Sequence, residues 1–356
     1  MVITPLDFLS ALVLGITIGL VLQRGRVCSN TAFRNLLLIR NPEVALVLVI
    51  AVMVELIGYQ LLQLFSLTEI FPGFSIYSNP IRFSLILIPI GSLLFGFGTV
   101  FAGGCAGGVC YRVGEGSIKS LLAFLGFGIG IAVFAVEPLR SAFAEVQNAT
   151  LWTIQGQTPS LEQILPRPIW TIGALIMLGV LVYKYRRTPP QLPHFREGWS
   201  PLMSGLVLGV LGTLARFFST VAGRPFGLST TDGIGELFSV VSSILGVTSS
   251  LLGWAGIMIL GLIIGASLSS LQINEFKVKT PNRRDIIRFF GGGLLLGIGA
   301  MLASGCNFGH ILGGIPELGI SSVIASIFMM FGNWISSYLM YNVLGEETPV
   351  STPLLL

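Results

Sequence analysis

Nine apolar stretches of about 20 residues each constrain what this chain can fold into. A helix of that length crosses the hydrocarbon layer of a bilayer, in which only helices and closed barrels satisfy their own backbone hydrogen bonds. The chain is therefore predicted to be an all-α polytopic membrane protein with about nine transmembrane helices. The stretches are 6–23, 44–65, 83–103, 118–137, 168–185, 201–218, 250–271, 288–304 and 320–344.

The composition supports a membrane protein and argues against several other classes. Only 10% of the 356 residues are charged, whereas soluble proteins carry about 25%. The N-terminal sequence MVITPLDF has no basic region, so we expect no cleavable signal peptide. The net charge of +4 is attributed to basic loops and not to nucleic-acid binding. Nothing matches GxxxxGK[ST], so no ATPase is predicted within the chain.

The basic residues between the apolar stretches predict the orientation. If the N-terminus lies outside, fifteen of the 20 Lys and Arg residues fall on the cytoplasmic side. The stretches Lys184–Arg196 and Lys277–Arg288 carry most of this bias. Positive charge collects on the cytoplasmic side of membrane proteins. We therefore expect an outside N-terminus and a cytoplasmic C-terminus in the bacterial inner membrane.

A glycine–cysteine motif occurs twice, 201 residues apart. The segments GFGTVFAGGCAGG (96–108) and GIGAMLASGCNFG (297–309) share the pattern GxGxxxAxGCxxG. The sequence LVLG also occurs twice, at 12–15 and 206–209. Five predicted helices separate corresponding elements, so the two halves would have opposite orientations in the membrane. We predict inverted repeats over 1–140 and 201–356, joined by a connector over 141–200 that contains the fifth helix.

Four stretches break the apolar pattern at comparable places, at 25–35, 103–116, 219–237 and 304–319. Each is too short to span, and irregular backbone at membrane depth needs protein or water around it. We predict four re-entrant loops, two from each face, that form an hourglass. Glycine allows the left-handed turns and close backbone approach that such loops need. The helices that follow the loops would direct positive dipole ends inward and favour an anion.

Three of the four breaks contain a cysteine: Cys28, Cys105 and Cys306. A single buried cysteine is usually a small hydrophobe, but three at related breaks favour a function. A neutral thiol is a weak donor, which suits an anion that must bind and leave. The corresponding position of the third break, counted from the LVLG repeat, is Ala222. Cys110 has no counterpart and is predicted to be dispensable.

Four further residues are predicted to contact the substrate: Gly104, Gly305, Asn307 and His310. For Asn307 and His310, hydrogen bonds that brace the loop are an equally strong interpretation. Glu236 and Glu317 are expected to brace backbone N–H groups. Arg26 and Arg224 lie near opposite mouths, where they would concentrate anions; for Arg26 the topological charge bias is a slightly stronger explanation. The sequence predicts no catalytic residue, cofactor or metal, because its cysteines and histidines do not cluster.

These motifs resemble those of the YeeE/YedE sulphur-transport family. The resemblance rests on RGRVCSNTAFR (24–34), FAGGCAGGVCYRVGEG (101–116) and ASGCNFGHILGGIPELG (303–319). It implies uptake of thiosulfate for sulphur assimilation, with Cys28, Cys105 and Cys306 relaying the anion through an hourglass-shaped protein and no enzyme activity. It also implies a TusA-like cytoplasmic sulphur carrier as partner, besides the lipid membrane itself.

Two other classes remain open at the level of sequence. A membrane thiol oxidoreductase would need two cysteines whose Cα atoms lie within about 7 Å. A channel for another inorganic anion would tolerate Cys→Ala substitutions. Few groups at membrane depth are available to carry coupling protons, among them Glu55 and His310. We therefore expect uptake to depend on cytoplasmic removal of thiosulfate, with proton symport as the alternative.

Overall fold

A computed structural model describes residues 4–64, 83–154, 158–224, 226–244, 252–278 and 280–345. Within these residues, nine helices are long and apolar enough to cross a membrane, which confirms the predicted class and number. Two of these spans are longer than predicted, Pro5–Leu38 and Leu87–Gly114, because the helix resumes after a short break. The C-terminal residues 346–356 lie outside the described part of the chain.

Six α-helices lie in the described residues of the first half, and their ends follow from local sequence. Thr4 and Asp7 form a capping box at the start of α1, which also begins with Pro5. A break of a few residues separates α1 from α2 and α5 from α6. The helices are α1 (Pro5–Arg24), α2 (Ser29–Leu38), α3 (Glu43–Leu64), α5 (Leu87–Phe101), α6 (Ala106–Gly114) and α7 (Ile118–Ala132).

The second half has a similar order of elements. Asn282 and Asp285 form the capping box that begins α14. The elements are α11 (Pro201–Val221), α12 (Thr230–Ile244), α13 (Trp254–Gln272), α14 (Arg283–Leu302), the π-helical turn η3 (Phe308–Gly314), α15 (Ile320–Tyr338) and η4 (Leu339–Val343). Between the halves lie η1 (Val133–Ala135), α8 (Leu139–Ala149), η2 (Leu161–Gln163), α9 (Arg167–Tyr185) and α10 (Pro193–Glu197).

Glycines let the spanning helices of the two halves pack closely. A side-chain carbon at Gly19 of α1 would lie 2.0 Å from the carbonyl oxygen of Leu262 in α13. Similar close approaches join α5 to α15 at Gly96, and α7 to α14 at Gly293. Helices in lipid associate through such small residues, because van der Waals contact replaces the hydrophobic driving force. The core therefore lies between the halves.

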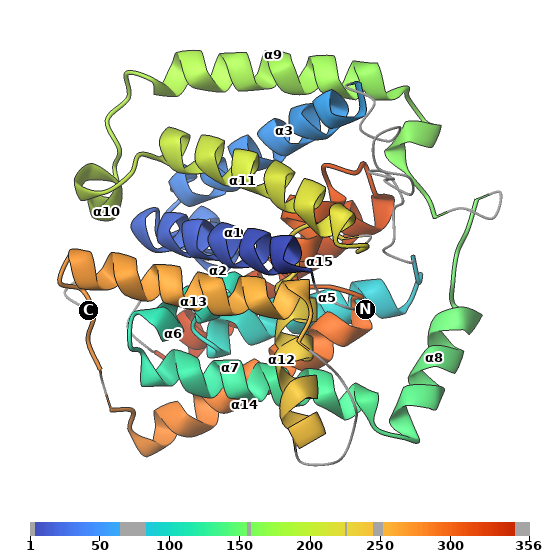
Figure 1. Cartoon of the computed structure of the whole chain (residues 1–356). Helices are drawn as coiled ribbons and strands as arrows, with labels where there is room; N and C mark the ends of the chain where they lie inside the picture. The colour runs from blue at the N-terminus through green and yellow to red at the C-terminus, as the bar shows by residue number, and fades with distance from the viewer. Residues whose placement is uncertain are drawn as a thin grey trace.

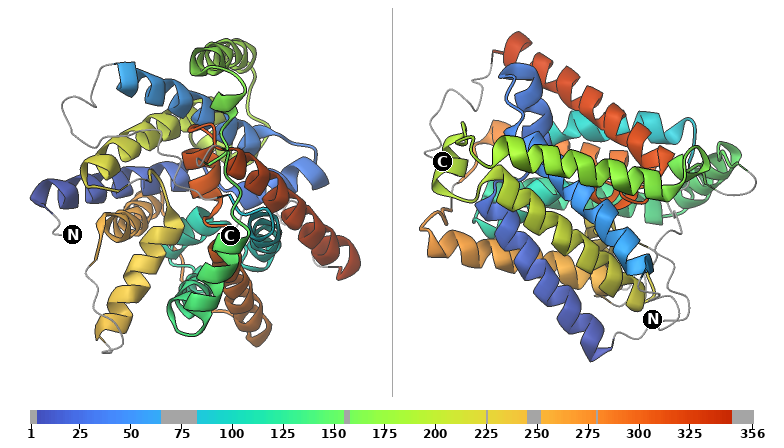
Figure 2. Two further views of the ribbon diagram at one scale, coloured as in Figure 1. Left: turned by 90° about the vertical axis from the view of Figure 1, so that its right-hand side faces the viewer. Right: turned by 90° about the horizontal axis from the view of Figure 1, so that it is seen from above.

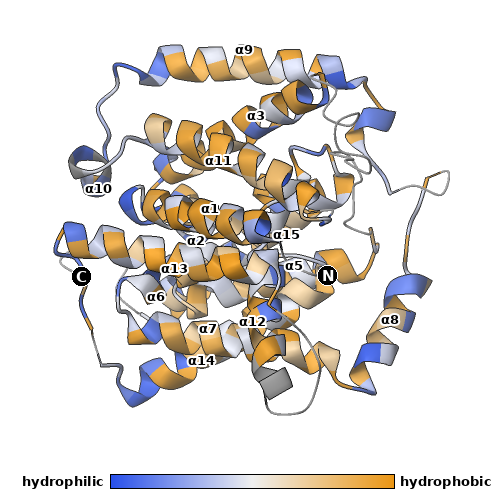
Figure 3. Ribbon diagram, viewed as in Figure 1, coloured by the Kyte–Doolittle hydropathy of each residue, from blue (hydrophilic) through white to orange (hydrophobic). Residues whose placement is uncertain are grey.

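The long helices run roughly side by side, and α8 lies across their ends (Figure 1). We call the end where α1, α9 and α13 finish and α11 and α14 begin the basic face. The other end, where α1 begins and α8 lies, is the opposite face. Hydrophobic residues dominate the long helices, whereas hydrophilic residues gather on α8, α10 and the helix ends (Figure 3). The basic face carries Lys184, Arg186, Arg187, Arg196, Arg283 and Arg284.

Helix α9 lies at the periphery of the bundle, at the top of the left-hand view of Figure 2. It packs on α3, and Ala174 is its one buried residue. Many of its other apolar side chains, including Ile176 and Val180, are exposed. An apolar surface of this kind fits a lipid environment. The breaks that carry the cysteines lie elsewhere, in the interior between the two halves.

Candidate functional site: two buried thiol contacts

Cys28 and Cys105 touch in the interior although 77 residues separate them in the sequence. Each residue is the N-cap of a short helix, Cys28 for α2 and Cys105 for α6. Their Sγ atoms are 3.3 Å apart, and both thiols are free and fully buried. The backbone N–H of Cys105 donates to the Cys28 sulphur at 3.3 Å. The two helix N-termini therefore meet at one pair of thiols.

Gly108 provides the space for this pair. A side-chain carbon at this position would lie 2.6 Å from the Cys28 sulphur and 3.3 Å from that of Cys105. The backbone N–H of Gly108 also donates to the Cys105 sulphur at 3.3 Å. The equivalent glycine of the second motif, Gly309, has open space around the same position. The glycine at 108 is thus required by the thiols rather than by helix geometry.

Cys306 makes the corresponding contact in the second half, with a hydroxyl in place of a second thiol. Its Sγ lies 2.8 Å from the Oγ1 of Thr230, and both residues are buried. Thr230 was not predicted, because the offset of the LVLG repeat, applied across the break, points to Ala222 instead. The break before α12 is longer than the break before α2, and Ser229 precedes α12 as Cys28 precedes α2. The offset of 201, already seen between Cys105 and Cys306, would have indicated the correct segment.

The two contacts adjoin each other in the centre of the bundle. A side-chain carbon on Gly107 would lie 2.4 Å from the ring of Phe308. These residues each lie two positions after a cysteine, Cys105 and Cys306. The starts of α6 and η3 therefore abut. Cys110 is also buried, but no described hydrogen bond joins its thiol to another side chain.

A left-handed residue stands two positions before each of the three cysteines. Their φ angles are +48° at Arg26, +71° at Gly103 and +59° at Ser304. The fourth break has Gly223 in the same conformation, at +76°. Glycine was expected at such turns, yet two of the four positions hold a larger residue. Ser304 accepts a hydrogen bond from Gln147 of α8 at 3.1 Å.

The remaining predicted contacts divide into two groups. The ring nitrogens of His310 lie 3.2 Å from the Oγ of Ser322 and 3.0 Å from the carbonyl oxygen of Ala303, which matches the bracing interpretation. Gly305 lies against that ring. Asn307 is 2% exposed, and its Oδ1 has no hydrogen-bond partner among the described residues. An unsatisfied buried oxygen of this kind is available to a ligand or water.

Arg112 is a further cation near the thiols. In the sequence it was counted only among the basic residues that predict the orientation. From the last turn of α6 its guanidinium reaches back and donates to the carbonyl oxygen of Gly103. A side-chain carbon on Gly104 would lie 2.5 Å from its Nη1. Gly104 thus leaves room for a positive charge beside Cys105. An arginine that folds back onto its own helix start leaves no trace in hydropathy or charge counting.

A pocket on the side of the opposite face lies next to the second thiol contact, because Ser229 and Gly305, the chain neighbours of Thr230 and Cys306, help to line it. It is lined by residues of the two breaks, namely Phe226, Gly227, Leu228, Ser229, Asp232, Ser304, Gly305, Gly309, Gly313, Gly314 and Glu317. Two of its carboxylates are paired: Glu317 with the buried Arg216, and Asp232 with Arg224, each at 3.0 Å. Glu317 was expected to brace backbone N–H groups, and its pairing with Arg216 corrects that expectation. Glu236 does accept a backbone hydrogen bond, from Gly256 at 2.6 Å.

No group of three His, Cys, Asp or Glu residues in the described ranges is arranged to hold a metal ion. The site is therefore described by two sulphur contacts, three short helices that begin beside them and a pocket on one side. Arginine guanidiniums lie near both contacts. Those of Arg26, Arg216 and Arg224 are paired with carboxylates.

Comparison with known proteins gives consistent matches over most of the chain. A family profile described as "Sulphur transport" matches residues 24–335. The "Thiosulfate transporter TsuA" of Spirochaeta thermophila is 34% identical over 343 residues, covering 93% of this chain and 98% of that protein. The Escherichia coli protein of the same name is 29% identical, covering 94% of each chain. The Escherichia coli "Probable transporter YedE" is 32% identical over 126 residues, covering 35% of this chain and 29% of its own length.

Proposed function

Because this chain belongs to the sulphur-transport family, we propose that it carries thiosulfate across the bacterial inner membrane for sulphur assimilation. It is a transport protein and not an enzyme, as its named relatives are transporters. The observation that carries the route is the adjoining pair of buried sulphur contacts, Cys306 with Thr230 and Cys28 with Cys105. Thiosulfate enters the pocket on the opposite face, passes these contacts in turn and leaves at the basic face.

Thiols suit the middle of such a path because they hold an anion weakly. Each is uncharged when protonated and offers one weak S–H donor. Arginine would form charge-assisted bidentate contacts and hold the anion longer. The N-termini of α2, α6 and α12 lie beside the thiols, and their partial positive charge offsets part of the cost of bringing a dianion to this depth. Gly104, Gly305 and Asn307 line the same region in this proposal.

The pattern of helix contacts supports two inverted repeats over 1–140 and 201–356. In the first half α1 packs on α13 of the second, and in the second half α11 packs on α3 of the first. Likewise α5 packs on α15 while α14 packs on α7, and α5 and α14 pack on each other. Exchanging equivalent helices leaves this list unchanged, as a two-fold axis in the membrane plane requires. The four breaks then form the constriction of an hourglass.

We place the basic face in the cytoplasm, with the N-terminus outside and the C-terminus inside. The support is the concentration of Lys and Arg in 184–196 and 277–288. Labelling of single cysteines introduced into Lys184–Arg196 tests this orientation. They should react in inverted membrane vesicles but not in intact cells. Reaction with an impermeant reagent in intact cells would reverse the proposed direction.

Removal of thiosulfate at the basic face supplies the driving force in this proposal. Bringing two negative charges against an inside-negative potential of 100 mV costs about 4.6 kcal/mol. A TusA-like sulphur carrier that docks on the basic face would remove the anion as it arrives. In liposomes without an acceptor, thiosulfate should then accumulate only below its outside concentration. Accumulation well above it under an inward proton gradient would replace this mechanism with proton symport.

Uptake of labelled thiosulfate by purified protein in liposomes tests the proposed route. Cys28→Ala, Cys105→Ala and Cys306→Ala should each lower the uptake rate by at least about tenfold. Cys110→Ala is the matched control, because it also removes a buried thiol and should transport normally. Wild-type rates in both Cys105→Ala and Cys306→Ala would remove the thiols from the route and favour a channel for another inorganic anion.

The 3.3 Å contact of Cys28 with Cys105 is the observation that favours a membrane thiol oxidoreductase instead. In that reaction the two thiols would form a disulfide and give two electrons and two protons to a membrane quinone. The two functions separate in a Cys28→Ser, Cys105→Ser double variant. A transporter should keep part of its uptake, because a hydroxyl is still a weak donor. An oxidoreductase would lose all activity, and its wild-type disulfide would accumulate when quinone is supplied.

A further inference from the structure

Arg26 keeps a long side chain in a backbone conformation that favours glycine. It lies two residues before Cys28 with a φ of +48°, and the equivalent position before Cys105 is Gly103. A residue with a Cβ is strained there. Gly25 stands directly before Arg26, so the chain holds glycine one position away from the turn that requires it. We therefore expect the guanidinium of Arg26 to make interactions that offset this backbone strain.

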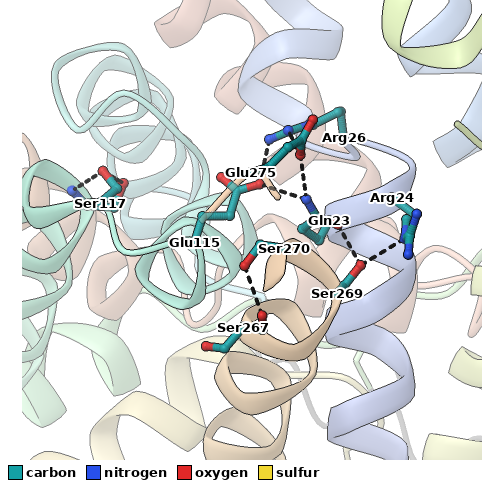
Figure 4. Close-up of polar contacts among 10 residues, drawn as sticks. Gln23, Arg24, Arg26, Glu115, Ser117, Ser267, Ser269, Ser270 and Glu275 are labelled. Carbon is teal, nitrogen blue, oxygen red and sulfur yellow. Dashed lines mark hydrogen bonds and ion pairs between the residues drawn. The ribbon is translucent and has the colours of Figure 1, made fainter. Parts of the chain in front are cut away.

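The guanidinium of Arg26 is held between two carboxylates, Glu115 and Glu275 (Figure 4). The amide nitrogen of Gln23 donates to the same two groups, at 3.2 Å and 2.8 Å respectively. We call these four residues the Arg26 lock. Glu115 follows α6 and Glu275 follows α13, so the lock ties the first half of the chain to the second.

The lock lies between the thiols and the basic face. Cys105 is the N-cap of α6 and Glu115 is its C-cap ten residues later, which places Glu115 about 15 Å from Cys105 along the helix axis. The Arg26 side chain is 20% exposed, whereas Cys28 and Cys105 are fully buried. On the other side, the pocket of the opposite face reaches Thr230's neighbour Ser229. The structure thus has a small pocket on the side of the opposite face and a cluster of charged groups on the side of the basic face.

The lock has the chemistry of an anion-exchange site. A guanidinium binds two oxygens of one oxyanion in parallel, as it binds a carboxylate. Here its donors already face two carboxylates, so an arriving sulphur oxyanion competes with groups of the same kind. Burial raises the pKa of the Glu115 carboxyl, and the charges of Arg26 and Arg112 act against that rise. The Glu115 carboxylate and the Arg26 guanidinium therefore stabilise each other only while they remain in contact.

We propose that Arg26 is the exit site of the path. Thiosulfate that leaves the Cys28–Cys105 pair displaces Glu115 and Glu275 from the guanidinium, and this exchange opens the path to the basic face. The proposal rests on thiosulfate being the substrate. The residues of the lock then have two separable roles: the carboxylates close the exit, and the guanidinium receives the anion.

The test measures transport and access in the same variants. Thiosulfate uptake is measured in liposomes. Alkylation of Cys28 is followed by site-resolved mass spectrometry, with an impermeant reagent applied to inverted vesicles that expose the basic face. The variants are Arg26→Ala and the double variant Glu115→Gln, Glu275→Gln. Arg24→Ala is the matched control, because Arg24 is two residues away and, within the described ranges, its guanidinium binds the neutral Ser269 and Gln272.

The two roles predict different results. In the double variant, Cys28 should be alkylated at least about fivefold faster while uptake stays within about twofold of wild type, because the receiving guanidinium remains. In Arg26→Ala, alkylation should also be faster, but uptake should fall at least about tenfold. Arg24→Ala should change neither measurement.

Two outcomes would overturn the proposal. If Arg26→Ala transported as well as Arg24→Ala, Arg26 would have no part in exit. If all lock variants lost uptake equally with unchanged alkylation, the lock would be a purely structural contact. A wild-type protein without thiosulfate uptake would refute the proposed function instead, and the alkylation rates would still show whether the lock closes the exit.

Discussion

The two sulphur contacts share one local frame but differ in their second partner and in what covers them. Each cysteine follows a left-handed residue by two positions and stands where a short helical segment begins. Toward the basic face, Cys105 contacts a thiol, and the Arg26 lock lies on that side of the thiol pair. Toward the opposite face, Cys306 contacts the hydroxyl of Thr230, and a pocket lined by their chain neighbours lies beside this contact. The repeated motif therefore determines the backbone around each cysteine, while residues outside the motif determine its partner and what lies beside it.

The largest expected difference between the pocket region and the Arg26 lock is in stability. Glu317→Ala leaves the buried Arg216 without its carboxylate, and breaking a buried pair costs about 3–5 kcal/mol. Glu275→Ala removes a carboxylate that is 43% exposed and should cost less than about 1 kcal/mol. Thermal denaturation in detergent compares the two variants. Equal midpoint temperatures would mean that the buried Glu317–Arg216 pair contributes no more to stability than the exposed carboxylate of Glu275 does.

The second difference concerns two equivalent glycines. Gly108→Ala would place a carbon 2.6 Å from the Cys28 sulphur and should lower thiosulfate uptake by about tenfold, or about 1.4 kcal/mol. Gly309→Ala meets open space and should stay within about twofold of wild type. Uptake in liposomes measures both. If the two variants behaved alike, the thiol pair would not depend on the space that Gly108 leaves.

These glycines also separate the features that the sequence predicts from those that it does not. The nine spans, the four breaks and the positions of Cys28, Cys105 and Cys306 follow from hydropathy and from one repeated motif. Gly108 and Gly309 are identical in that motif, yet only Gly108 touches a thiol. Their difference depends on which distant segment packs against each one, and a single sequence carries no record of that packing.

The missed residues have the same kind of explanation. Thr230 was missed because the break before α12 is longer than its counterpart, which shifted the alignment of the repeats. Arg112 was counted as a topological charge, although its side chain folds back to Gly103. Arg26 and Ser304 occupy turns that favour glycine, because each makes a contact that glycine cannot make. Each case is a tertiary contact that overrides a local preference.

The smallest expected effect tests the hydroxyl of Thr230. Thr230→Ser keeps the hydroxyl beside Cys306 and should change thiosulfate uptake by less than about twofold. Thr230→Val keeps the shape but removes the donor and acceptor, and uptake should fall by about three- to fivefold. Thr230→Cys would make the two contacts alike and should remain active. An unaltered rate in Thr230→Val would show that Cys306 works without its hydroxyl partner.

The central claim is that thiosulfate lies against the thiols of both contacts on its way through the membrane. Protection from alkylation tests it most directly, with each cysteine of the purified protein quantified by mass spectrometry. Thiosulfate should slow alkylation of Cys28, Cys105 and Cys306, whereas the same concentration of sulfate should not, and Cys110 should react at one rate throughout. Unchanged rates at all three thiols, at a thiosulfate concentration that saturates uptake, would contradict the account.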